Sequence, residues 1–254
     1  MFSNNQLKNV QNETIQYVMK TENLKNSEFF RFNFNTLPSV KKLNTPTKIE
    51  VFDGDTLEAT LKYQHKNNKR YCFLILANAY HPGGGWEHGA KAQEESVCRR
   101  SNIWLAFDKI NYPLDEFGGI YGKNVAIFRD TKNNNFKFLN KIHFSNCIFI
   151  AAYSNPPLKS KTELEKEYAI KTKKKIISML TECLKRGDKN LVLGALGCGA
   201  FANPPDHIAK IFKEVLHSDN FKDRFEHVVF AIIDNKYTKN REIFENILCS
   251  KETK

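Results

Sequence analysis

Short apolar runs alternate along the chain with segments whose apolar residues recur at helical spacing. Runs of this kind are typical of strands that are buried on both faces of a sheet. The clearest run covers residues 71–77, Tyr-Cys-Phe-Leu-Ile-Leu-Ala, and ends at Asn78. Further strands are predicted over residues 49–52, 125–128, 147–152, 191–193 and 228–233.

Helical periodicity is clearest over residues 204–217. Five apolar residues there fall at the i, i+3, i+4, i+7 and i+8 positions of one helix face, namely Ile208, Ile211, Phe212, Val215 and Leu216. Other helices are predicted over residues 6–20, 55–63, 92–107 and 162–186, and after the last strand to about Leu248. Strands that alternate with amphipathic helices predict an α/β fold, with a mostly parallel sheet covered by helices on both faces.

The organisation of the chain indicates one domain. No internal repeat, Pro/Ser-rich linker or low-complexity tract divides residues 1–254, and we expect an N-terminal helical extension over about residues 1–45. The 254 residues, 41% of them hydrophobic, are enough to bury a substantial core.

Several classes of protein are disfavoured by the composition. No stretch approaches the roughly 18 consecutive apolar residues of a membrane helix, and Met1–Gln6 lacks the apolar core of a signal peptide. We therefore expect a soluble, cytoplasmic protein with no membrane partner. The six cysteines form no C-x-x-C pair and no Cys–His zinc spacing, so buried free thiols are expected, with neither a metal nor a cofactor.

The net charge of +11 has two interpretations. A basic protein attracts polyanions such as nucleic acids or a phosphate-rich polymer. The heavy use of Lys and Asn throughout the chain is also explained by biased composition alone. No zinc, helix-turn-helix or RNP-like motif is present, so direct binding of nucleic acid is not expected.

The most informative segment is a glycine run followed by two adjacent carboxylates. The first glycine loop, Pro82–Lys91, contains Gly83-Gly84-Gly85, and Glu94 and Glu95 follow at the start of a predicted helix. Consecutive glycines let the backbone approach a ligand closely, because no Cβ stands in the way. A loop that brings a ligand to a carboxylate pair suggests acid–base chemistry on a phosphate- or sugar-bearing substrate.

A second glycine loop, Gly194–Pro205, has the composition of a phosphate cradle. Its glycines free the backbone to turn N–H groups inward, and the loop leads into the predicted 204–217 helix with Asn203 as a candidate N-cap. Phe201 either lies against a sugar or base or packs into the core. Both loops follow the carboxyl ends of strands, where α/β folds bind ligands, so they are expected to face one crevice.

These motifs resemble those of the poly(ADP-ribose) glycohydrolases. The Gly83-Gly84-Gly85 run with Gln93-Glu94-Glu95 is similar to the family signature, and Cys98-Arg99-Arg100-Ser101 resembles its microbial-type branch. Residues 55–59 and 197–201 with Asn203-Pro204 are also similar, in matching order over about residues 50–235. The resemblance implies a macrodomain-like fold, a mixed, mostly parallel sheet between helices, that binds ADP-ribose.

The resemblance also implies roles for individual residues. Glu95 would be the catalytic acid for cleavage of ribose–ribose O-glycosidic bonds, and Glu94 would hold the terminal ribose. Other substrate-binding positions carried over by motif are Asn78, Gly84, Gly85 and Gln93 around the ribose, and Gly197, Cys198, Gly199, Ala200 and Phe201 around the diphosphate. The partners would be poly(ADP-ribose) or ADP-ribosylated proteins, with ADP-ribose as the product and no metal required.

Two positions depart from the family pattern. His81 stands where the microbial family usually has Asn, and Leu196 replaces a common Trp. Neither change removes the proposed acid. A non-catalytic ADP-ribose reader and a hydrolase of mono-ADP-ribosylated protein stay open as alternatives.

Overall fold

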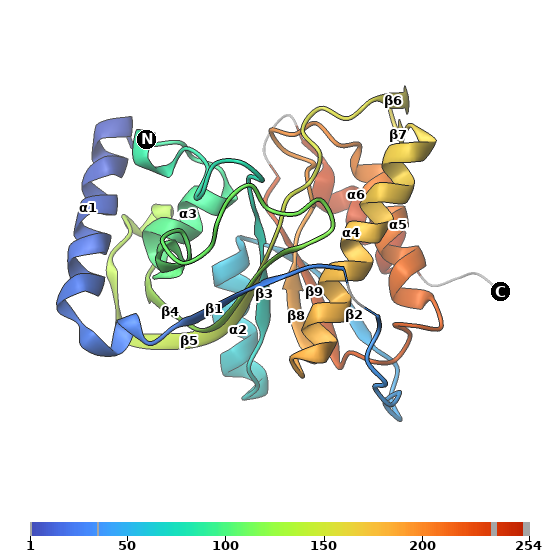
Figure 1. Cartoon of the computed structure of the whole chain (residues 1–254), viewed down its shortest axis with the longest axis horizontal. Coiled ribbons are helices and arrows are strands. Elements are labelled where there is room, and N and C mark those ends of the chain that lie inside the picture. The colour runs from blue at the N-terminus through green and yellow to red at the C-terminus, as the bar shows by residue number, and fades with distance from the viewer. Residues whose placement is uncertain (1, 35, 235–237, 251–254) are drawn as a thin grey trace.

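A seven-stranded sheet forms the centre of the computed structural model, which describes residues 2–34, 36–234 and 238–250 (Figure 1). Its strand order is β1-β4-β5-β3-β8-β9-β2. The strands are β1 (Glu28–Phe32), β2 (Lys48–Asp53), β3 (Cys72–Leu76), β4 (Gly119–Arg129), β5 (Phe138–Ile150), β8 (Asn190–Leu193) and β9 (His227–Ile232). The helices are α1 (Asn4–Lys20), α2 (Thr56–Asn67), α3 (Gln93–Arg100), α4 (Lys166–Lys185), α5 (Pro205–His217) and α6 (Asn240–Leu248).

The sheet is mixed and mostly parallel, as the sequence predicts. Strands β5, β3, β8, β9 and β2 pair in parallel, whereas β1 and β4 add an antiparallel edge beside β5. The antiparallel pair β4 and β5 is much longer than the apolar runs at 125–128 and 147–152, because β4 begins with the buried residues 119–122 and β5 begins with the more exposed residues 138–141.

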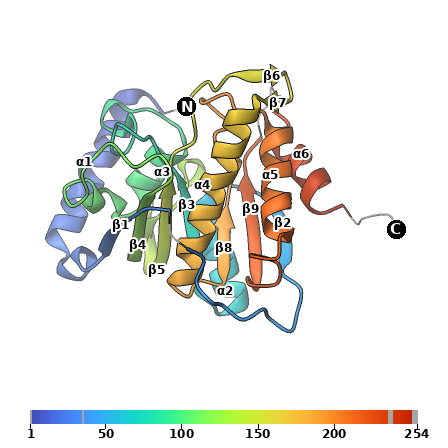
Figure 2. The same ribbon diagram turned by 45° about the vertical axis from the view of Figure 1, so that its right-hand side comes forward.

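Side-chain alternation along β3 divides the core into two layers. Cys72 and Leu74 face the hydrophobic cluster under α4, α5 and α6, while Phe73 and Ile75 face the cluster under α2 and α3. Figure 2 shows α4 and α5 lying across one face of the sheet. All four of these residues are at most 1% exposed, which explains why the run contains no polar residue.

Two predicted helices differ from the structure. In the predicted 92–107 helix, α3 ends at Arg100. Ser101 then forms an isolated β-bridge with Ile127, and a short 3-10 turn follows over Ile103–Ala106. The Asn102 side chain accepts from the Ala126 N–H and donates to the Leu24 carbonyl, so tertiary contacts override local helical preference. The predicted 162–186 helix starts later, at Lys166 (α4), because its first residues form β7 (Glu163–Leu164), which pairs with β6 (Leu158–Ser160) in a small hairpin.

The N-terminal region is not wholly helical. Helix α1 begins with a capping box between Ser3 and Gln6, which the sequence analysis did not identify. A short 3-10 turn, Glu22–Lys25, follows, and Glu28–Phe32 then joins the sheet as β1. The predicted extension thus begins with a helix, α1, and only its β1 segment belongs to the central sheet.

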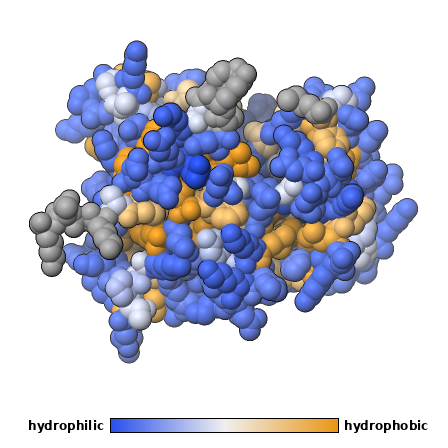
Figure 3. Space-filling view, turned by 180° about the vertical axis from the view of Figure 1, so that it is seen from behind, coloured by the Kyte–Doolittle hydropathy of each residue, from blue (hydrophilic) through white to orange (hydrophobic). Residues whose placement is uncertain are grey.

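Apolar side chains gather toward the middle of the rear face of the molecule, inside a largely hydrophilic surface (Figure 3). Among the described residues, no helix is both long and apolar enough to cross a membrane.

Candidate active site

The two glutamates lie in the first turn of α3, directly behind the first glycine loop. Glu94 accepts hydrogen bonds from the backbone N–H of Asn78 (2.8 Å) and of Gly83 (3.2 Å). Glu95 accepts one from the N–H of Gly85 through Oε1 (2.9 Å). The loop therefore folds around the carboxylates, because they accept hydrogen bonds from its backbone N–H groups. Both glutamates are buried.

Gly84 makes this close approach possible. Its φ is +59°, and a Cβ at this position would lie 2.5 Å from Glu95 Oε1 and 3.3 Å from Glu94 Oε2. Any other residue would be strained by the backbone and would collide with a carboxylate. The sequence analysis assigned Gly84 and Gly85 to the ribose, and in the structure they contact the carboxylates themselves.

The two carboxyl groups are in different environments. Burial raises the pKa of Glu94 to about 8, and the negative charge of Glu95 adds to this, against the opposing effect of the Asn78 and Gly83 N–H groups. Glu95 Oε2 is buried and has no hydrogen-bond partner among the described residues. The pair thus combines a carboxyl that holds a proton near neutral pH with a neighbour whose second oxygen is uncommitted.

Gln93 and Asn78 are fixed by the protein itself. The Gln93 side chain accepts from the Leu76 N–H (2.9 Å) and donates to the Leu74 carbonyl and to Thr56 Oγ1, so it ties the start of α3 to β3 and α2. Asn78 Oδ1 accepts from the N–H groups of Tyr80 and His81 and shapes the turn after β3. Both residues position the carboxylate pair, and Gln93 also lines the cavity described below.

The second glycine loop is organised by Asn203. Its Nδ2 donates to the carbonyls of Tyr153 (2.7 Å), Phe201 (3.1 Å) and Gly197 (3.2 Å). Asn203 is therefore not the N-cap that the sequence suggests, because its amide is used inside the loop and α5 begins at Pro205 with Pro204 as the cap. Gly197 has a φ of +75°, and a Cβ there would lie 2.5 Å from Asn203 Nδ2.

The remaining residues of this loop are open toward a ligand. Within the part of the chain that the structure describes, the N–H groups of Gly199, Ala200 and Phe201 meet no acceptor, and nothing lies within 4 Å of a Cβ built on Gly199. Phe201 is half-buried and belongs to none of the hydrophobic clusters, so it does not pack into the core. Burial raises the pKa of the Cys198 thiol, which argues against a reactive thiolate.

One cavity of about 680 Å³ lies between the start of α3 and the second glycine loop, and the first loop contributes Lys91 to its lining. It is lined by Ala92 and Gln93 at the start of α3 and by Gly197, Gly199, Ala200 and Phe201 of the second loop. Glu94 and Glu95 lie next to this lining but are not part of it, because Gly84 and the rest of the first loop cover them. Within the described chain, no cluster of three or more His, Cys, Asp or Glu side chains is placed to hold a metal.

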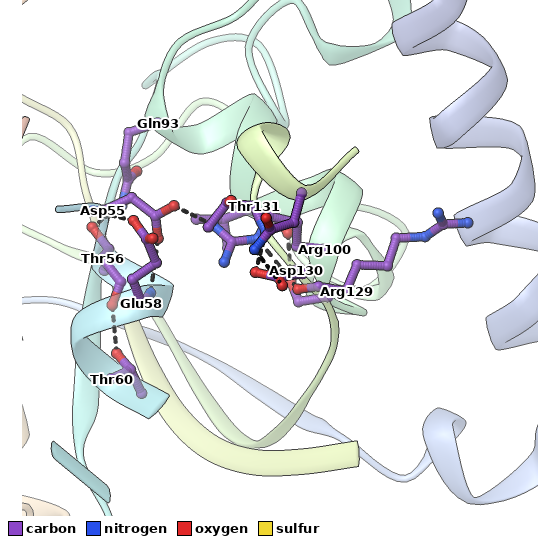
Figure 4. A network of polar contacts seen from close by, with 12 residues as sticks. Asp55, Thr56, Glu58, Thr60, Gln93, Arg100, Arg129, Asp130 and Thr131 are labelled. Atoms are coloured by element: carbon purple, nitrogen blue, oxygen red, sulfur yellow. Dashed lines mark hydrogen bonds and ion pairs between the residues drawn. The ribbon is translucent and has the colours of Figure 1, made fainter. Parts of the chain in front are cut away.

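A polar network that the sequence did not predict forms another wall of the cavity (Figure 4). Asp55 accepts from Arg100 at 2.6 Å, and Asp55 also forms a capping box with Glu58 at the start of α2. The Arg100 side chain is 1% exposed, and its Nε donates to the Arg129 carbonyl. The Asp-x-x-Glu spacing in the sequence could have predicted the capping box of α2. The pairing of Asp55 with Arg100 joins residues far apart in the chain, so no local spacing predicts it.

The other residues of the first loop have structural or exposed positions. Trp86 is buried and stacks on Trp104 with 6.5 Å between ring centroids, as expected of a residue that anchors the loop. His81 and His88 are exposed, and Leu196, the second departure from the family pattern, is buried.

Comparison with known families agrees with this geometry. The model for "Microbial-type PARG, catalytic domain", where PARG is poly(ADP-ribose) glycohydrolase, matches residues 3–130. This chain belongs to that family. The match includes the first glycine loop and both glutamates, and the resemblance seen in the sequence is confirmed. No curated protein was found to match the chain.

Solved PARG structures share the fold over nearly the whole chain. The enzyme from Thermomonospora curvata is 23% identical with a TM-score of 0.79, covering 95% of this chain and 98% of its own. A T267K mutant from Deinococcus radiodurans, solved in complex with ADP-ribose, is 28% identical with a TM-score of 0.67, covering 80% of this chain and 84% of its own. Family and fold together identify the chain as an enzyme of the PARG type.

Proposed function

We propose that this PARG family member hydrolyses the ribose–ribose O-glycosidic bonds of poly(ADP-ribose) and releases ADP-ribose, with Glu95 as the general acid. The observation that carries this assignment is the environment of Glu95. One carboxyl oxygen is fixed by the Gly85 N–H, and the other is buried beside the substrate cavity with no partner among the described residues. A carboxyl held in this way is oriented by the protein and has one oxygen left for the substrate.

The chemistry needs one proton at the leaving oxygen. Cleavage passes through an oxocarbenium-like state, in which the glycosidic C–O bond breaks as Glu95 protonates the departing ribose oxygen. A water molecule then adds to the anomeric carbon and returns a proton to the Glu95 carboxylate. The neighbouring Glu94 carboxyl, whose pKa is raised to about 8 by burial, holds a proton near neutral pH beside Glu95.

The rest of the substrate is assigned to the two loops. Glu94 would bind the hydroxyls of the terminal ribose, with Gly84 and Gly85 alongside. The uncommitted amides of Gly199, Ala200 and Phe201 would bind the diphosphate, because backbone N–H groups in a glycine-rich turn before a helix form an anion site. Phe201 lines the cavity and would lie against the sugar.

The direct test is release of ADP-ribose from defined polymer by the wild type and by Glu95→Gln. Loss of a positioned general acid predicts a fall in kcat of about 10²- to 10⁴-fold. Glu87→Gln is the matched control, since Glu87 is an exposed glutamate of the same loop, and its activity should equal that of the wild type. Equal rates for wild type and Glu95→Gln would remove Glu95 from the mechanism.

Two further measurements on the same proteins separate the alternative functions. Binding of ADP-ribose by calorimetry with no product from polymer or from mono-ADP-ribosylated protein would favour a reader. Turnover of mono-ADP-ribosylated protein alone would make that linkage the substrate.

A further inference from the structure

One buried polar group near the carboxylate pair has no role in the assignments above. Tyr112 lies on the segment between α3 and β4, and its ring is partly exposed while its hydroxyl oxygen is buried. This hydroxyl has no hydrogen-bond partner among the described residues. Buried hydroxyl groups are normally satisfied, and an unsatisfied one in a native structure calls for an explanation in terms of function or strain.

The segments on either side of Tyr112 contact the backbone next to the two amides that hold Glu94. Phe107 packs against Gly83, whose Cβ, if present, would lie 2.7 Å from the Phe107 ring. The Leu114 N–H donates to the Ala79 carbonyl (2.8 Å), one residue after Asn78. Tyr112 stands edge-on to Phe107, with 6.5 Å between ring centroids. These contacts place the segment that carries Tyr112 beside the turn after β3 and the first glycine loop, whose amides hold Glu94.

Burial keeps the Tyr112 hydroxyl protonated. The pKa of Tyr112 is raised above its ordinary value, mainly by burial and additionally by the Glu94 carboxylate. The hydroxyl therefore stays protonated over the whole physiological range, so it is available as a hydrogen-bond donor.

A clamp from the edge strand holds Tyr112 in place. Arg31 of β1 donates from Nη1 to the Asn111 carbonyl (2.5 Å) and from Nη2 to the Pro113 carbonyl (2.9 Å). Its Nε is paired with Asp115 at 2.7 Å. The residues on both sides of Tyr112 are thus fixed by one guanidinium, and the hydroxyl is kept buried although the described residues offer it no partner.

We infer that the Tyr112 hydroxyl is a further substrate-binding group, which donates a hydrogen bond to the ribose hydroxyl that binds Glu94. A hydroxyl has one hydrogen and two oxygen lone pairs, so a single contact with Glu94, whether the Glu94 carboxyl is protonated or not, leaves at least one lone pair of the ribose oxygen in need of a donor. Tyr112 supplies that donor. This inference rests on the proposed placement of the ribose at Glu94.

The test compares the affinities of ADP-ribose and ADP for the wild type and for Tyr112→Phe by calorimetry, with thermal unfolding measured in parallel. ADP lacks the terminal ribose, so it reports on the diphosphate and adenosine contacts alone. The expected result is a loss of ADP-ribose affinity of about 5- to 30-fold, with unchanged ADP affinity, as for removal of one buried hydrogen bond. The melting temperature should not fall, because the removed hydroxyl has no partner in the free protein.

Tyr71→Phe is the matched control. Tyr71 is a buried tyrosine directly before β3, at the end of that strand away from the carboxylates, and its hydroxyl has hydrogen-bond partners. That hydroxyl contacts His227 Nδ1 at 2.7 Å and accepts from Asn67 at 2.6 Å. Tyr71→Phe should lower the melting temperature and leave both affinities unchanged.

Unchanged ADP-ribose affinity in Tyr112→Phe, or an equal loss for ADP, overturns the inference. A wild type that binds ADP-ribose but releases none from polymer contradicts the proposed hydrolysis instead, so the two failures are distinguishable.

Discussion

The two glycine loops occupy equivalent places at the carboxyl ends of the neighbouring strands β3 and β8, yet they use their amides in opposite ways. In the first loop the N–H groups of Gly83 and Gly85 are donated to Glu94 and Glu95. In the second loop, the described chain offers no acceptor to the N–H groups of Gly199, Ala200 and Phe201.

Glycine therefore has a different role in each loop. The first loop uses its glycines to approach two carboxylates of the same chain and to cover them. The second uses its glycines and Asn203 to hold amides open for a ligand. A glycine run therefore indicates that the backbone lies close to another group. Whether the loop serves acid–base chemistry or anion binding depends on whether its N–H groups bond to carboxylates of the chain or stay free for a ligand.

The largest effect is expected from a single methyl group in the first loop. Gly84→Ala should lower kcat/KM on polymer by at least about 100-fold, because the Cβ would lie 2.5 Å from Glu95 Oε1 and a misplaced catalytic group of this kind costs about two orders of magnitude. Gly187→Ala is the control, since Gly187 has a similar φ of +83° and nothing within 4 Å. If the Gly84 variant keeps wild-type activity, the loop does not set the position of Glu95.

The buried charge of the first loop predicts a pH-dependent stability. Folded Glu94 keeps its proton up to a pKa of about 8, whereas the unfolded chain loses it at the ordinary value of 4.5. Between these values the folded state binds more protons, so stability falls as the pH rises. Glu94→Gln should be increasingly more stable than the wild type across this window, by about 2–4 kcal/mol at its upper end.

Urea unfolding at several pH values measures this gain, with the exposed Glu87→Gln as the control. Parallel curves for Glu94→Gln and the wild type would show that Glu94 does not hold a proton in the folded protein.

A smaller effect is expected in the second loop. Asn203→Ala removes three hydrogen bonds from Nδ2 and should weaken ADP binding by about 10-fold, because the open amides lose their arrangement. Gly84→Ala should leave ADP binding unchanged, so the two variants report on the two loops separately. Calorimetry measures both affinities, with the exposed Asn220→Ala as the control. Normal ADP binding by Asn203→Ala would place the diphosphate elsewhere.

The sequence was most informative where local pattern and burial agree. Strand β3 was predicted within one residue at each end, because a strand buried on both faces must be apolar throughout. Helix α5 was predicted within one residue from its amphipathic spacing. Strand β1 was missed, since Glu28–Phe32 lies at the sheet edge and carries charged residues at exposed positions.

The candidate site was predicted only in part, for a similar reason. The glycine–glutamate motif is local, and the structure brings its parts together as expected. The Asp55–Arg100 pair, the Arg31 clamp and the Tyr112 hydroxyl join residues from distant segments. Contacts of this kind leave no spacing in the sequence.

The sequence by itself determined the α/β class, the two glycine loops and the adjacent carboxylates, because each depends on neighbouring residues. Only the tertiary structure decided what each group does: which glutamate is desolvated, which oxygen is left without a partner, and which amides stay open. Those properties depend on burial and on hydrogen bonds between segments far apart in the chain, such as Asn78 to Glu94 and Tyr153 to Asn203. They exist only once the chain has folded.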